Sequence, residues 1–218
     1  MNAQRLVVSI VLALGIALAA PPAIGQEPRF DLGLRLDVVA ADGVPANDIP
    51  AVGLFGHRRL SERWWIGLAV DHSPKFDVER PYEFLGLVGD PAAGEIDADA
   101  TSTRLTGWIE RVYARPGRRL EWFWSAGGGV ALIDVDAVAG PLDGGGSYDI
   151  AQEVKTELLA SVGAGLRLGF ARRWAFEAAL RADRHFTDWT VADRVSGRAA
   201  SLTDYTVQGI DLGMAYRF

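Results

Sequence analysis

Hydrophobic and polar side chains alternate along most of this chain with a period of two residues. In the clearest stretch, Val154 to Phe170, the even-numbered positions are mainly Val, Leu and Ala, and the odd-numbered positions are mainly charged, Ser or Gly. Successive side chains of a β-strand point to opposite faces, so this pattern predicts a strand with one apolar and one polar face.

The same alternation recurs in other segments. After residue 25, no segment shows the apolar stripe with a 3.6-residue period that an amphipathic helix would have. Together they predict eight strands, at about Phe30–Val38, Ile49–Arg59, Trp64–Asp71, Thr101–Ala114, Trp122–Leu132, Val154–Phe170, Trp174–Asp183 and Ile210–Phe218.

The connections between these strands alternate between short and long. The short ones are Ser61–Arg63, Arg115–Arg119 and Ala171–Arg173, and the long ones are Ala41–Asp48, Ser73–Ala100, Asp136–Asp149 and His185–Ser201. Outer-membrane barrels have an even strand number, short periplasmic turns and long external loops. The fold class predicted here is therefore all-β: an eight-stranded antiparallel up-and-down transmembrane β-barrel.

The N-terminal 25 residues have the layout of a secretory signal peptide. Arg5 precedes an uncharged apolar run from Leu6 to Ala20, and Ala23 and Gly25 offer the small residues of a cleavage site. The alternative, a transmembrane anchor, needs roughly 20 apolar residues, which is longer than this run. We expect a signal peptide at 1–25 and a single barrel domain at 26–218.

Charge and aromatic residues divide between the two predicted ends of the barrel. Without Arg5 the chain has 21 basic and 28 acidic residues, a balance that argues against a nucleic-acid partner. Arginines concentrate in the short turns and acids in the long loops. One aromatic girdle is predicted beside the short turns, formed by Trp64, Tyr113, Trp122, Phe170, Trp174, Tyr216 and Phe218.

The chain ends with a polar residue, a glycine two positions later and two aromatic residues: Asp211, Gly213, Tyr216 and Phe218. This arrangement resembles the C-terminal assembly signal of outer-membrane proteins, which implies recognition of the last strand by the barrel-assembly machinery. The alternative is a soluble edge strand that happens to end in Phe.

The whole mature chain resembles the small Gram-negative outer-membrane barrels of the OmpA transmembrane domain, OmpX and OmpW type. Gly53–Arg58 with Trp64–Leu68 is similar to their second hairpin, and Ser125–Ala131 to their glycine-rich fifth strand. The resemblance implies an outer-membrane location and assembly as a barrel. We also expect contact with membrane lipid and lipopolysaccharide, and a monomer. It does not imply one activity.

An interior of charged residues is expected, because an eight-stranded barrel is just wide enough for side chains to fill it. The predicted lumen network comprises Arg35, Asp37, Asp71, Glu110, Glu157, Arg167, Glu177, Arg181, Asp183 and Asp211; Arg104, Lys155 and Arg217 face the same way. A salt-bridged plug is the main interpretation, and a narrow ligand or ion path is the alternative.

The three histidines, His57, His72 and His185, raise the possibility of catalysis on lipid A. A hydrolase would need histidine, serine and an acid to converge in space, which spacing alone does not show. No catalytic, metal-binding or cofactor-binding residue is assigned. The expected function is a non-enzymatic outer-membrane barrel with a structural, adhesive or minor permeation role. The alternatives are a lipid A-modifying hydrolase and a soluble lipocalin-like periplasmic barrel.

Overall fold

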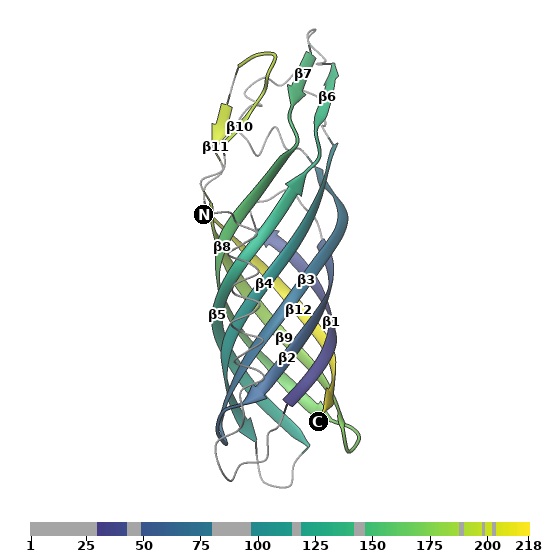
Figure 1. Ribbon diagram of the computed structural model, residues 1–218, viewed down its shortest axis with the longest axis vertical. Coiled ribbons are helices and arrows are strands. Elements are labelled where there is room, and N and C mark those ends of the chain that lie inside the picture. The colour runs from purple at the N-terminus through teal and green to yellow at the C-terminus, as the bar shows by residue number, and fades with distance from the viewer. Residues whose placement is uncertain are drawn as a thin grey trace.

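The computed structural model describes residues 30–42, 49–79, 97–114, 119–141, 147–187, 190–197, 199–201 and 204–218. The predicted signal peptide lies outside these residues. Eight long strands form one closed barrel (Figure 1). They are β1 (Phe30–Asp42), β2 (Ile49–Arg59), β3 (Trp64–Glu79), β4 (Asp97–Ala114), β5 (Leu120–Val135), β8 (Glu153–Gly169), β9 (Trp174–Phe186) and β12 (Tyr205–Arg217).

Every strand of the barrel is hydrogen-bonded to an antiparallel neighbour on each side. The ring closes between β1 and β12, where Leu34 lies opposite Met214 and Asp37 opposite Asp211. Closure leaves no unpaired strand edge, which is the condition for a sheet to cross a lipid bilayer. The predicted fold class, an eight-stranded antiparallel barrel, is confirmed.

The strands extend further at one end than the sequence predicts. β3 continues through Pro74 to Glu79, with a shift of register between Ser73 and Phe76, and β4 begins at Asp97. Proline has no amide hydrogen to donate to a ladder, and the irregularity accommodates it. The predicted connection at Ser73–Ala100 is therefore too long; the actual connection is residues 80–96.

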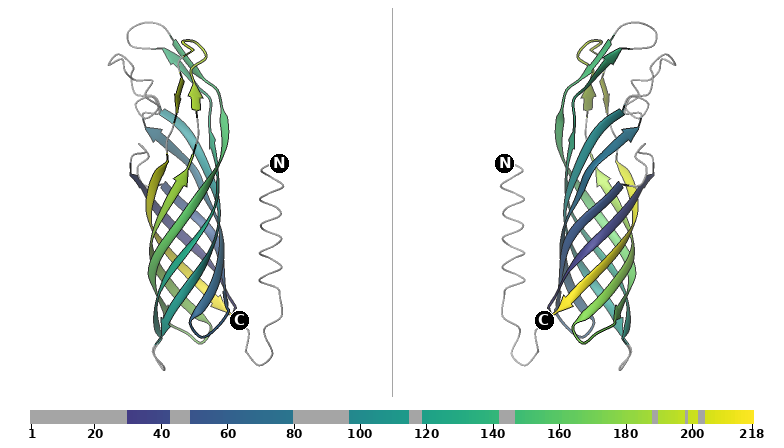
Figure 2. Two further views of the ribbon diagram at one scale, coloured as in Figure 1. Left: turned by 90° about the vertical axis from the view of Figure 1, so that its left-hand side faces the viewer. Right: turned by 90° about the vertical axis from the view of Figure 1, so that its right-hand side faces the viewer.

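Two other predicted loops contain small hairpins beyond the barrel. β6 (Val138–Pro141) pairs with β7 (Ser147–Ile150), and β10 (Thr190–Ala192) pairs with β11 (Ala199–Ser201). Both hairpins stand at the same end, opposite the short turns (Figure 2). The molecule thus has a plain end with turns and an elaborated end with hairpins.

The apolar residues of the alternating pattern face outward around the barrel. Leu34 is 65 % exposed and Leu180 is 66 % exposed, whereas Asp37 and Asp183, on the other face of the same strands, are buried. This arrangement is the reverse of a soluble lipocalin-like barrel, so that alternative is wrong. The described residues include no helix long and apolar enough to span a membrane.

Large interior side chains pack where the neighbouring strands carry glycine. The ring of Phe55 lies close to Gly213 and Gly33. A Cβ atom added at Gly213 would be 2.9 Å from this ring, and one added at Gly33 would be 2.7 Å from it. These two glycines are needed for close approach of an aromatic ring. A second buried group consists of Trp65, Val112 and Phe123.

Candidate functional site

The interior of the barrel holds two layers of ion pairs, one above the other. The layer nearer the short turns is centred on Arg167 of β8, which is 1 % exposed. Its Nη2 atom donates to Glu110 Oε1 at 2.9 Å, and its Nε donates to Glu177 Oε2 at 2.9 Å. We call this group, with His57, the Arg167 layer.

The Arg167 guanidinium is also fixed by its non-acidic neighbours. Its Cζ lies 5.0 Å from the ring centroid of Trp65 and 5.2 Å from that of Phe123. The same Nη2 atom is 3.0 Å from Nδ1 of His57, which accepts this hydrogen bond. His57 is fully buried, and its other ring nitrogen is 3.8 Å from Glu110. One cation therefore contacts side chains from five other strands.

The second layer contains three arginines and four aspartates. The sharing of carboxylates is its main feature: Asp37 binds both Arg104 and Arg181, and Asp183 lies 3.3 Å from Arg104 and 3.0 Å from Arg181. We call this group, which also contains Arg35, Asp71 and Asp211, the three-arginine layer.

Arg35 and Asp211 complete the three-arginine layer. Arg35 binds Asp71 through two hydrogen bonds, one of them from Nε to Oδ1 at 2.6 Å. Asp211 accepts from Arg181 at 3.2 Å and lies 3.7 Å from Arg35. Each buried aspartate of this layer thus contacts at least one arginine, as a charge in a low-dielectric interior requires.

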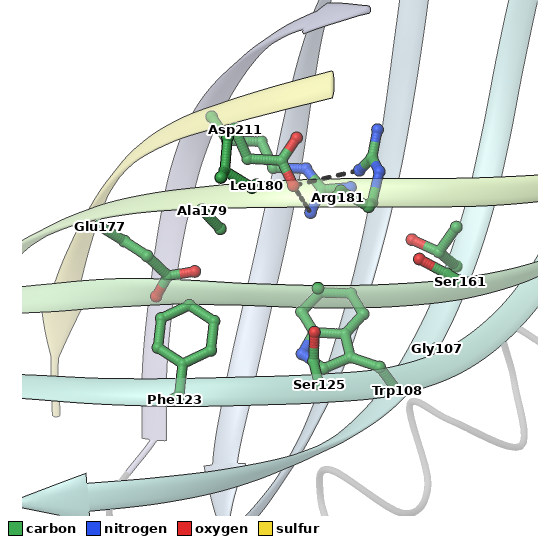
Figure 3. A pocket seen from close by; sticks show the side chains of 13 residues that line it. Gly107, Trp108, Phe123, Ser125, Ser161, Glu177, Ala179, Leu180, Arg181 and Asp211 are labelled. Carbon is green, nitrogen blue, oxygen red and sulfur yellow. Dashed lines mark hydrogen bonds and ion pairs between the residues drawn. The ribbon is translucent and has the colours of Figure 1, made fainter. Parts of the chain in front are cut away.

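A small cavity separates the two layers (Figure 3). It is lined by Arg35, Arg181 and Asp211 on one side and by Glu177 and Phe123 on the other. A water-sized sphere can occupy about 30 Å³ of it, enough for roughly two water molecules. The ion pairs cross the lumen on both sides of this space, as the interpretation of a salt-bridged plug expects.

Three further polar groups lie beyond the layers. Towards the hairpins, Glu157 Oε2 accepts from the Tyr205 hydroxyl at 2.7 Å and lies 2.9 Å from His185 Nδ1. Towards the turns, Arg217 binds Asp31 through two contacts of 3.2 Å. At the mouth, Lys155 lies 3.3 Å from Glu153.

All ten residues of the predicted lumen network face the interior, in three places. Arg167, Glu110 and Glu177 lie in the first layer, Arg35, Asp37, Asp71, Arg181, Asp183 and Asp211 in the second, and Glu157 near the mouth. The sequence did not predict the aromatic contribution of Trp65, Phe123 and Tyr205 to the lumen. Each of them occupies a polar-face position of its strand, and that position is the signal that could have identified them.

The three histidines lie far apart. His72 is exposed and its Nδ1 is 3.0 Å from the Thr103 hydroxyl, while the adjacent Ser73 is buried on the other face of β3. His185 contacts Glu157, and His57 belongs to the Arg167 layer. Among the residues that the structure describes, no three potential ligands gather as a metal site would require.

The residues of the C-terminal motif have distinct positions in the folded barrel. Asp211 belongs to the three-arginine layer, and Gly213 lies beneath Phe55. Tyr216 accepts a hydrogen bond from Arg173 at 2.8 Å and packs against Trp174. Phe218 is 66 % exposed, and its amide donates to the carbonyl of Phe30.

The two external hairpins are joined to one another through Asp193. Its carboxylate accepts from the amides of Asp149 at 2.9 Å, Val195 at 3.1 Å and Ser196 at 3.0 Å, and from the Ser196 hydroxyl at 2.5 Å. Burial raises the pKa of this carboxyl, but the four donors outweigh it and bring the pKa down to about 2. We call this contact the Asp193 junction.

Comparison with solved structures identifies the same architecture in small outer-membrane barrels. A major outer membrane protein from Thermus thermophilus matches with a TM-score of 0.58 and 13 % identity over 88 % of this chain and 100 % of its own. Neisserial surface protein A gives a TM-score of 0.52 at 10 % identity, and OprG from Pseudomonas aeruginosa 0.51 at 11 %; each match covers 88 % of this chain and 97 % of the other. At these identities the likeness shows the fold. No protein-family model and no curated protein sequence matches the chain.

Proposed function

We propose that this chain is a bacterial outer-membrane β-barrel protein with a structural or adhesive role carried by its external hairpins. The observation that carries the proposal is the inverted distribution of polarity: an apolar surface around a closed barrel whose interior is charged. Such a surface is stable in lipid and would aggregate in water.

Export and assembly follow from the same proposal. Residues 1–25 would be removed as a signal peptide, and residues 26–218 would form the barrel. The short, arginine-rich turns would face the periplasm, and the hairpins would face outward. Both edges of β12 are paired in the closed barrel, so the assembly machinery would meet a free edge of this strand only before closure.

A lumen crossed by two layers of ion pairs supports a main role on the outside of the protein. The two ion-pair layers leave room for about two water molecules between them, which is too little for a solute to pass without rearrangement. Permeation is therefore at most minor. The Asp193 junction instead holds β6, β7, β10 and β11 together as one external unit, and a preordered surface loses less entropy on binding.

The first experiment is fractionation of membranes combined with heat-modifiable gel mobility. We expect the protein in the outer-membrane fraction, with a folded band that shifts on heating. A soluble periplasmic protein without the shift would overturn the proposal.

Two further measurements divide the candidate roles. Deletion of residues 138–150, which removes one hairpin, should reduce attachment of cells to surfaces while leaving the heat-modifiable barrel intact. We expect no hydrolase activity, so His72→Ala and His185→Ala should leave the mass spectrum of lipid A unchanged. Loss of a lipid A modification in either variant would favour the hydrolase instead.

A further inference from the structure

The outer surface of the barrel carries one arginine in an unusual position, Arg111 of β4. It lies on the lipid-facing side, in register with Trp64 of β3 and Trp124 of β5, and Ile109 on the same face is 51 % exposed. The inward neighbours Glu110 and Val112 are buried. Arg111 therefore belongs to the aromatic girdle and not to the lumen.

Two aromatic rings lie close to the Arg111 guanidinium. Its Cζ lies 5.5 Å from the ring centroid of Trp64 and 5.3 Å from that of Tyr113. The rings are themselves fixed, since Trp64 packs edge-on against Trp124 at 5.9 Å, and Trp124 Nε1 donates to the Tyr113 hydroxyl at 3.3 Å. We call Arg111 with Trp64, Tyr113 and Trp124 the arginine frame.

Arg111 lacks a protein acceptor within the described part of the chain. No ion pair or hydrogen bond joins its guanidinium to another described residue, and its Nε is shielded from solvent without a hydrogen-bond partner. Arg173, at the same end of the barrel, provides a contrast. Its Cζ also lies over an aromatic ring, that of Tyr216 at 5.9 Å, but its Nη1 donates to the Tyr216 hydroxyl at 2.8 Å.

Tryptophan and tyrosine side chains of membrane proteins concentrate at the level of the lipid headgroups. A guanidinium held at that level, with its charge unpaired, presents a planar set of donors that matches a phosphate group. We propose that the arginine frame binds the phosphate of an anionic phospholipid in the leaflet next to the short turns. This inference rests on the proposed membrane location and adds a specific lipid site to it.

The test uses the full chain folded into vesicles of equal parts phosphatidylglycerol and phosphatidylcholine. After mild detergent extraction, native mass spectrometry counts the phosphatidylglycerol molecules that remain bound. Arg111→Gln should reduce this retention about tenfold, the loss expected for one charge-assisted contact. The matched control Arg173→Gln should retain phosphatidylglycerol as the unaltered protein does.

Several results would overturn the proposal. One is that Arg111→Gln retains as much phosphatidylglycerol as the unaltered protein. Another is that Arg173→Gln loses as much phosphatidylglycerol as Arg111→Gln does, which would indicate a general effect of charge. Displacement of the lipid by millimolar inorganic phosphate would indicate a site for a free anion. If Arg111→Gln does not fold, Arg111→Lys takes its place; it keeps the charge but loses the planar donors, and unchanged retention in it would overturn planar recognition.

Folding of each variant is followed separately by the heat-modifiable shift in the same vesicles. Failure of the unaltered protein to insert would contradict the proposed function as a whole. Normal insertion without any dependence of lipid retention on Arg111 would contradict only the arginine frame.

Discussion

Buried carboxylates need hydrogen-bond donors, and the Arg167 layer and the Asp193 junction supply these donors in two different ways. Inside the barrel the donor is one guanidinium, and its partners His57 and Glu110 are 110 and 57 residues away in sequence. Outside, the donors to Asp193 are mainly backbone amides, two of them within three residues. The first arrangement depends on closure of the whole barrel, whereas the second depends on local turns. Their loss should therefore have effects of different size and reach.

The largest effect is expected for Arg167→Met. This substitution leaves Glu110 and Glu177 buried in the lumen without their cation, which costs about 3–5 kcal/mol of the free energy of unfolding. Urea titration of the reconstituted barrel, followed by heat-modifiable gel mobility, measures the change. The control adds Glu110→Gln and Glu177→Gln to Arg167→Met and should recover much of the loss. A single variant as stable as the unaltered barrel would show that water, not Arg167, stabilises these carboxylates.

Arg104→Met should have a smaller effect, because the carboxylates of the three-arginine layer are shared. Asp37 and Asp183 both keep a contact with Arg181 when Arg104 is removed. We expect a loss of about 1–3 kcal/mol in the same urea titration. A loss equal to that of Arg167→Met would contradict the distinction between a layer with one cation and a layer with three.

The charged interior was predictable, but its pairing was not. Alternation alone places Arg167, Glu110 and Glu177 on the inner face, because the apolar residues next to each of them in its strand face outward. Which of them meet depends on the tilt and register of strands around the closed ring. The Arg167–His57 contact joins β8 to β2, two strands that are not neighbours in the barrel. No local pattern in the sequence carries that information.

Strand ends were less predictable than strand centres. The predicted last strand begins at Ile210 and leaves Tyr205 outside it, but β12 begins at Tyr205 itself. Continuing the alternation backward from Asp211 places Tyr205 on the inner face, where its hydroxyl binds Glu157. Similarly, Pro74 suggests the end of a strand, because a proline removes a ladder hydrogen bond, yet β3 continues to Glu79.

Asp193→Ala should affect the hairpins and leave the barrel unchanged. It removes the acceptor for three amides and one hydroxyl, which we expect to cost about 1 kcal/mol locally. Limited proteolysis should cleave residues 190–201 faster, while the urea midpoint of the barrel stays the same. The matched control is Arg194→Ala. It removes only the exposed ion pair between Arg194 and Asp149, whose charged atoms are 3.7 Å apart, and it should not change cleavage. A shifted urea midpoint in Asp193→Ala would mean that the junction and the barrel unfold together.

Acid acting on the same junction should have an effect no larger than that of Asp193→Ala. The pKa of Asp193 is about 2 in the folded protein, below the ordinary value of about 3.9. Its ionised form therefore adds stability that is complete above about pH 4, declines as the pH falls towards 2 and is absent below the folded pKa. Hydrogen exchange of the Val195 and Ser196 amides should show protection at pH 4 that weakens progressively towards pH 2. There it should converge on the exchange of Asp193→Ala, which has no pH dependence from this source. If protection were already lost at pH 5, the hydrogen bonds to Asp193 would not be what holds the two hairpins together.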